Sequence, residues 1–168
     1  MAASEQPKEL LNPSQQLEAL GLVRRAVELW VEKEIRFTPP AGSSLNRICT
    51  AAFVTLTLQG RLRGCIGSLE PREPLDFTLV DCAISAACND SRFPAVTKAE
   101  VAQVCFEVSA LTPPRLLTGR QDIVVGRDGV LVEIAGRRGL LLPQVASRYG
   151  WDQETFLDRA CVKAGFEA

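Results

Sequence analysis

The 168-residue chain contains no histidine. This absence excludes Ser-His-Asp and Cys-His catalytic machinery. It also removes the commonest protein ligand for catalytic zinc and non-haem iron. Any acid or base must therefore be an aspartate, glutamate, lysine, tyrosine or cysteine. The sequence predicts no metal site and no bound cofactor.

The chain also lacks any Cys-x-x-Cys pair, although it has six cysteines. They stand at positions 49, 65, 82, 88, 105 and 161, spacings that do not suit a structural zinc site. No segment near the N-terminus has the apolar run of a signal peptide. We therefore expect reduced thiols in a cytoplasmic protein.

Neither a charge excess nor a long apolar run is present. The formal net charge is −1 and the isoelectric point is about 5.6, so the composition does not favour general nucleic-acid binding. No stretch approaches the roughly 20 apolar residues that span a bilayer, so no membrane contact is expected. Residues 1–13 are predicted to be a flexible polar lead-in, and residues 14–168 to form a single domain.

The periodicity of apolar residues predicts an α+β fold, with a mainly antiparallel β-sheet flanked by helices. Strands occur in runs joined by tight turns, which favours this class over a doubly wound parallel sheet. Helices are expected over 14–35, 75–88, 143–149 and 153–164. Strands are expected over 51–58, 61–67, 104–111, 122–126, 129–134 and 139–142. Thr97 and Glu100 have the spacing of a capping box.

The segment Leu62–Gly67, with the sequence Leu-Arg-Gly-Cys-Ile-Gly, is the first candidate site. Glycines at a strand end let the backbone turn sharply and approach a ligand, and exposed amides there form anion-binding nests. A guanidinium at Arg63 favours the reactive thiolate form of a cysteine. We therefore predict Cys65 as a nucleophilic or redox thiol, beside an anion site made by Arg63, Gly64 and Gly67. The spacing alone favours the alternative, a buried cysteine with two glycines that serve only packing.

The second candidate is the turn Asn89–Pro94, which follows the predicted helix over 75–88. Asp90 is placed to act as a proton acceptor or a positioning group, and Arg92 to bind an anionic group. The alternative is an ordinary polar turn in which Arg92 pairs with Asp90.

Four segments together resemble the AMMECR-type domain, a family named after a human gene in the Alport syndrome, mental retardation, midface hypoplasia and elliptocytosis region. They are Leu62–Gly67, Asp90–Pro94, Leu142–Ala146 and Lys163–Gly165, in this order. The resemblance extends from about residue 15 to the C-terminus. Bacterial and archaeal members of the family include protein A of the AmmeMemoRadiSam system. It implies an α+β fold with a central antiparallel sheet, a larger and a smaller subdomain, and a cleft faced by the Arg-Gly-Cys segment. It also implies Memo-like and radical-SAM proteins as partners, and it brings no established reaction.

Two functional hypotheses follow. The first is a cytosolic enzyme, or a subunit of an enzyme complex, that acts on a small anionic or nucleotide-like substrate. In it, Cys65 and Asp90 are catalytic, while Arg63, Gly64, Gly67 and Arg92 bind the substrate. The second is a non-catalytic module that binds a ligand or a protein through the same segment.

Overall fold

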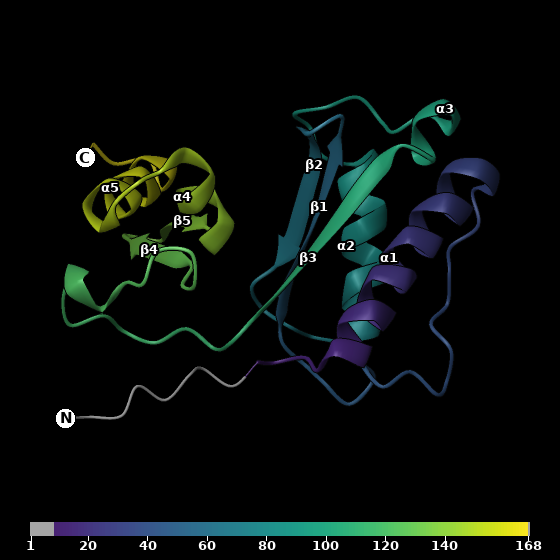
Figure 1. The fold of residues 1–168 in the computed structure, drawn as a ribbon, viewed down its shortest axis with the longest axis horizontal. Coiled ribbons are helices and arrows are strands. Elements are labelled where there is room, and N and C mark those ends of the chain that lie inside the picture. The colour runs from purple at the N-terminus through teal and green to yellow at the C-terminus, as the bar shows by residue number, and fades with distance from the viewer. Residues whose placement is uncertain (1–8, 168) are drawn as a thin grey trace. The chain divides into compact units, whose positions relative to one another are not determined.

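The computed structural model describes residues 9–167, so the first eight residues of the predicted lead-in lie outside the described part of the chain. Two compact units follow each other in sequence (Figure 1). The N-terminal unit ends at Pro113, and the C-terminal unit begins at Pro114. Each unit has a hydrophobic core of its own. This architecture confirms the predicted α+β class with a larger and a smaller subdomain.

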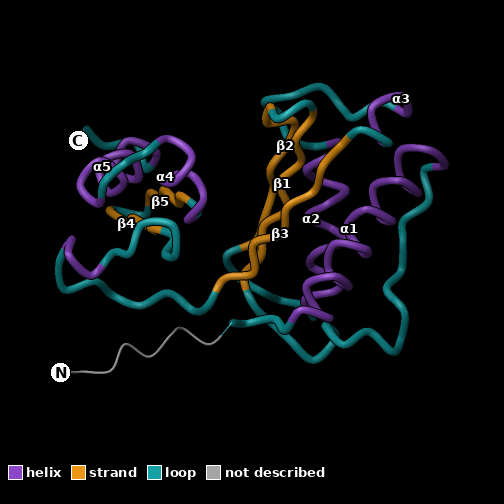
Figure 2. The backbone as a smooth tube through the Cα atoms, viewed as in Figure 1, coloured by secondary structure: helices purple, strands orange, loops and turns teal. Residues whose placement is uncertain are grey.

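The N-terminal unit is built on a three-stranded antiparallel sheet with the strand order β2-β1-β3 (Figure 2). The strands are β1 (Ala51–Leu58), β2 (Arg61–Ser68) and β3 (Val104–Leu111). Helices α1 (Pro13–Lys33) and α2 (Leu75–Cys88) pack against one face of the sheet, and α3 (Lys98–Val101) precedes β3. No helix among residues 9–167 is long and apolar enough to span a bilayer.

The helix boundaries follow from local sequence signals. Asn12 caps α1 by accepting a hydrogen bond from the Gln15 amide at 2.9 Å, and Pro13 occupies the first helical position. The predicted capping box at α3 is also present, because the Glu100 carboxylate accepts from the Thr97 amide at 2.8 Å. These helix starts confirm the prediction.

Alternation along β1 decides which face of the sheet each residue occupies. Ala52, Val54 and Leu56 are fully buried in the core that α1 and α2 share with the sheet. The intervening residues therefore belong to the opposite face, away from α1 and α2. Thr55 lies on that face and pairs in register with Cys65 of β2.

The C-terminal unit holds an antiparallel pair of strands, β4 (Val130–Ile134) and β5 (Arg137–Leu141), with α4 (Pro143–Tyr149) and α5 (Gln153–Lys163). Its core is formed mainly by side chains of β4, β5, α4 and α5, with Phe156 fully buried. The two helices and both strands of the pair were predicted within a few residues.

The strand predicted over 122–126 is wrong. The chain instead forms a 3₁₀ turn, η1 (Arg120–Asp122), followed by an irregular loop. The Asp122 carboxylate accepts from the Thr118 amide at 3.0 Å, and the Asp128 carboxylate accepts from the Val124 amide at 2.9 Å. These side chains replace the hydrogen bonds that a strand ladder would have made.

The turn between β4 and β5 contains a residue in an unfavourable conformation. Ala135 has φ 50°, and Gly136 beside it has φ 77°. Left-handed backbone is costly for alanine, and two-residue hairpin turns of this kind prefer Asn-Gly. Replacing Ala135 with asparagine should therefore raise the free energy of unfolding by roughly 0.5 kcal/mol. Urea denaturation of both proteins measures the difference.

The matched control is Ala135→Val, because a β-branched residue tolerates positive φ least. We expect this variant to be less stable than the parent protein. Equal stability of the asparagine and valine variants would contradict the role given to the turn.

Candidate functional site

The segment Leu62–Gly67 lies within strand β2. It pairs with β1 through the register Leu56↔Gly64, Thr55↔Cys65 and Phe53↔Gly67, and the strand continues to Ser68. Neither Gly64 nor Gly67 has a positive φ. The expected sharp turn and its anion-binding nest are therefore absent from this segment, because successive amides of an extended strand point in opposite directions.

Close packing explains instead why glycine stands at positions 64 and 67. A Cβ on Gly64 would lie 2.0 Å from the carbonyl oxygen of Ala86 in α2. A Cβ on Gly67 would lie 2.2 Å from a ring carbon of Phe53 and 2.5 Å from the carbonyl oxygen of Ala52. Gly64 thus allows β2 to pack directly on the α2 backbone, and Gly67 leaves room for the Phe53 ring.

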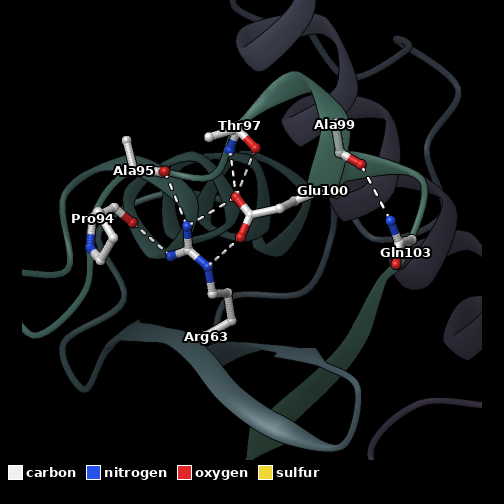
Figure 3. Close-up of polar contacts among 7 residues, drawn as sticks. All are labelled: Arg63, Pro94, Ala95, Thr97, Ala99, Glu100 and Gln103. Atoms are coloured by element: carbon white, nitrogen blue, oxygen red, sulfur yellow. Dashed lines mark hydrogen bonds and ion pairs between the residues drawn. The ribbon is translucent and has the colours of Figure 1, made fainter.

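A β-bulge interrupts the β1–β2 pairing at Arg63. Thr57 pairs with Leu62 and Leu56 pairs with Gly64, so Arg63 has no partner residue on β1. Bulges redirect the side chain of the extra residue. Here the redirected side chain reaches the loop before α3 and the first turn of that helix (Figure 3).

Arg63 is held there by internal partners. Its Nε and one Nη donate to the two carboxylate oxygens of Glu100, each at 3.1 Å. The Nη atoms also donate to the carbonyl oxygens of Pro94, at 2.5 Å, and Ala95, at 3.0 Å. Four of the five N–H groups of the guanidinium are thereby used. An anion at Arg63 would have to compete with the Glu100 carboxylate.

Glu100 acts on two groups at once. Its carboxylate closes the capping box with Thr97 and forms an ion pair with Arg63. Both partners of the ion pair are largely shielded from solvent, since the exposed fractions of the Arg63 and Glu100 side chains are 11% and 25%. These contacts lower the pKa of Glu100 to about 2, with the hydrogen bonds from Arg63 as the main cause and the Thr97 amide second. The bulge is thus tied to α3 by an ionised pair.

Asp90 and Arg92 form the second cluster, and they hold the Cys65 peptide group. The Asp90 carboxylate accepts from the Cys65 amide at 2.8 Å. Arg92 donates to both Asp90 oxygens, at 2.9 and 2.7 Å, and to the Cys65 carbonyl at 3.2 Å. We call Asp90 and Arg92 the Asp–Arg clamp. It fills the positions that the backbone of a neighbouring strand would occupy at Cys65.

The ionisation of Asp90 limits its chemistry. The side chain is only 4% exposed. Hydrogen bonds from Arg92, and after them from the Cys65 amide, hold the pKa of Asp90 far below its usual range. A carboxylate of such low basicity is a poor proton acceptor near neutrality. The geometry agrees better with the positioning role predicted for Asp90 than with a general base.

The Cys65 thiol is half-buried, and its sulfur lies 3.2 Å from the Thr55 hydroxyl oxygen across the sheet. Arg92 is the accessible cation beside it, with 53% of its side chain exposed. Arg92 bonds Asp90 and the Cys65 carbonyl through Nε and one Nη, and its guanidinium also interacts with the Cys65 side chain. Within residues 9–167, no three cysteine, aspartate or glutamate side chains are arranged to hold a metal ion.

The structure therefore brings Cys65, Asp90 and Arg92 together, and it directs the Arg63 side chain away to α3. Sequence reasoning missed Thr55 and Glu100. The capping-box spacing identified Glu100 as a helix cap, but nothing local indicated its pairing with a residue 37 positions away. The functional roles predicted for these residues stay predictions.

Comparison with known proteins identifies the family. The AMMECR1 family model matches residues 20–168. The chain belongs to the AMMECR1 family. A protein of Thermofilum pendens is 44% identical over 161 residues, which cover 86% of this chain and 76% of that protein.

Two further relatives of the AMMECR1 chain are archaeal. A Methanothermobacter thermautotrophicus protein is 51% identical over 119 residues, and the match covers 67% of this chain and 62% of that protein. The crystal structure of the uncharacterized protein PH0010 from Pyrococcus horikoshii superimposes with a TM-score of 0.89 at 38% identity, covering 94% of this chain and 83% of that one. The Pyrococcus horikoshii protein thus shares the fold of this AMMECR1 chain, and the names of the three relatives describe no reaction.

Proposed function

We propose that this AMMECR1-family chain is a non-catalytic binding module that presents strand β2 to a ligand or protein. The observation that supports this most is the Asp–Arg clamp, in which an ionised pair hydrogen-bonds the backbone amide and carbonyl of Cys65. Arg63 is likewise neutralised by Glu100. Charges arranged in this way stiffen a strand edge, and they leave no described carboxylate at Cys65 suited to proton transfer.

The test compares the reactivity of Cys65 with that of other thiols in the same molecule. Cys49 and Cys105 are exposed and serve as internal references. Since a binding cysteine needs no activation, we expect iodoacetamide to modify Cys65 no faster than either reference at any pH between about 5 and 9. Peptide mapping by mass spectrometry measures the three rates. A Cys65 rate about ten times that of both references at or below neutral pH would overturn the proposal.

A second experiment addresses the partners. We propose Memo-like and radical-SAM proteins of the same organism as the first candidates, because the family resemblance suggests them. Co-purification with each should survive Cys65→Ala, which keeps the strand, and should be lost in Asp90→Ala, which releases the clamp. Loss in Cys65→Ala with retention in Asp90→Ala would contradict a role for the strand edge.

The second candidate is an enzyme, or a subunit of one, that acts on a small anionic or nucleotide-like substrate in the cytosol. It is supported by the exposed guanidinium of Arg92 beside the half-buried Cys65 thiol. A thermal-shift screen with nucleotides and phosphorylated metabolites tests it. A ligand that raises the melting temperature of the parent protein, but not of Arg92→Gln, would favour this candidate.

A further inference from the structure

Strand β2 forms one edge of the three-stranded sheet, and its backbone groups alternate between β1 and solvent. The Cys65 amide and carbonyl point outward, because both are bonded by the Asp–Arg clamp. Gly67 lies two residues further along the strand, so its amide and carbonyl point outward as well.

The two halves of this edge differ in their protection. The half nearer the β1–β2 turn is covered by the loop between α2 and α3, which supplies the Asp–Arg clamp. The same loop supplies the carbonyl oxygens of Pro94 and Ala95 that bind Arg63 (Figure 3). At Gly67, no described residue hydrogen-bonds the outward amide or carbonyl. Unpaired strand edges recruit extended chains, and most proteins protect them.

A depression of about 610 Å³ adjoins the open half of the edge. Its walls are the end of β2 from Gly67, the following loop, and α2. The lining residues include the carboxylates of Glu70, Glu73 and Asp81 and the guanidinium of Arg72. Arg36 pairs with Asp81 at 2.5 Å, so the net formal charge of these five groups is −1, and Glu73 is the carboxylate best placed to attract a cation. The charge of the depression therefore complements a basic ligand.

One residue that lines the depression, Cys82, carries an uncharged side chain. Cys82 is 6% exposed, and burial, followed by the nearby Asp81 charge, raises the pKa of its thiol to about 11. A lining that combines an uncharged, nearly buried thiol with carboxylates suits a lysine side chain, whose aliphatic stem is apolar and whose ammonium stays near water.

The geometry points to a peptide site: we infer that the β2 edge at Gly67 pairs with an extended, lysine-containing peptide segment of a partner protein. One peptide residue exchanges backbone hydrogen bonds with Gly67, in the manner of strand addition. The residues on either side of it direct their side chains toward the helix-covered face, where α2 borders the depression. The inference rests on the proposed binding function and names its partner class.

The probe is the acetylated and amidated peptide Lys-Val-Lys-Val-Lys, titrated into the full-length ¹⁵N-labelled chain at low salt. We expect the amide signals of Gly67, Ser68 and Leu69 to shift together. The peptide Glu-Val-Glu-Val-Glu should bind about ten times more weakly, because its charge repels the rim. Glu73→Gln should weaken binding of the lysine peptide about threefold. Glu32→Gln, at an exposed position of α1, should leave the affinity for the peptide unchanged.

N-methylation separates strand pairing from simple charge attraction. In the inferred register a valine lies opposite Gly67, and the lysines are its neighbours. Methyl groups on the two valine amides remove the donor that faces Gly67 whichever valine lies there, and binding should be lost. Methyl groups on the lysine amides, which point away from β2, should leave binding intact. Equal binding of the two methylated peptides, equal binding of the glutamate peptide, or an unmoved Gly67 signal would each overturn the inference.

The outcomes for the two proposals are distinguishable. A slow Cys65 thiol together with no peptide binding would reject this partner class and leave the binding module standing. A highly reactive Cys65 together with peptide binding would reject the proposed function and leave the peptide site standing.

Discussion

Replacing Gly64 with alanine should lower the free energy of unfolding of the N-terminal unit by more than about 3 kcal/mol. The added Cβ would lie 2.0 Å from the Ala86 carbonyl oxygen, which is far inside van der Waals contact. The obstacle is helix backbone rather than a side chain that can rotate away. Either β2 must separate from α2, or the bulge at Arg63 must move. Urea denaturation followed by far-UV circular dichroism measures the loss.

The matched control is Gly21→Ala, the same substitution in the interior of α1. Gly21 has no atom within 4 Å of an added Cβ, and it lies on the exposed side of the helix. Because alanine is the better helix former, we expect a gain of about 0.8 kcal/mol. Gly64→Ala with the stability of the parent protein would show that β2 does not pack on α2 as closely as described.

Acidification should destabilise the N-terminal unit through Asp90 and Glu100. Both carboxyl groups have a lower pKa in the folded chain than in the unfolded one. The unfolded chain therefore binds more protons in acid, so their stabilisation is complete above pH 5 and declines as the pH falls from about 4.5 toward 2. Glu100 is partly exposed, which reduces its share to about 2 kcal/mol.

Asp90→Asn and Glu100→Gln should each lower stability near neutral pH and flatten its decline in acid. Denaturation curves at a series of pH values between about 2 and 7 test this. Glu28→Gln serves as the reference, because Glu28 is 30% exposed, much like Glu100, but its carboxylate lies 3.8 Å from the Arg25 guanidinium, too far for a hydrogen bond. Its curve should run parallel to that of the parent protein. If the Asp90 and Glu100 variants also ran parallel to it, neither pair would contribute to stability.

The limits of sequence reasoning are clearest at the elements it placed wrongly. Residues 122–126 have the composition of a strand, yet Asp122 and Asp128 bond the local backbone and prevent a ladder. The glycines of Leu62–Gly67 suggested a turn, because flexibility is their commonest use. Their actual reason is the closeness of Ala86 and Phe53, and no local pattern contains that information.

At the candidate site, too, the sequence indicated the residues but not their arrangement. Cys65, Asp90 and Arg92 could be selected from the sequence because their residue types carry chemistry. Their arrangement could not, since the Asp90 carboxylate reaches an amide 25 residues away only when α2 packs under β2. Arg63 was assigned to an anion site without any signal for the bulge that turns it toward Glu100.

The sequence by itself determined the family, through the four segments that resemble it. It determined the α+β class and most helix and strand boundaries, because caps, prolines and apolar periodicity act over a few neighbouring residues. It also determined that no histidine chemistry operates here. Only the tertiary structure decided that the Leu62–Gly67 segment is a strand edge. Contacts from α2, α3 and the loop between them cover one half of that edge, and these depend on packing between elements far apart in the chain. At the other half, no residue between 9 and 167 hydrogen-bonds the outward amide or carbonyl of Gly67.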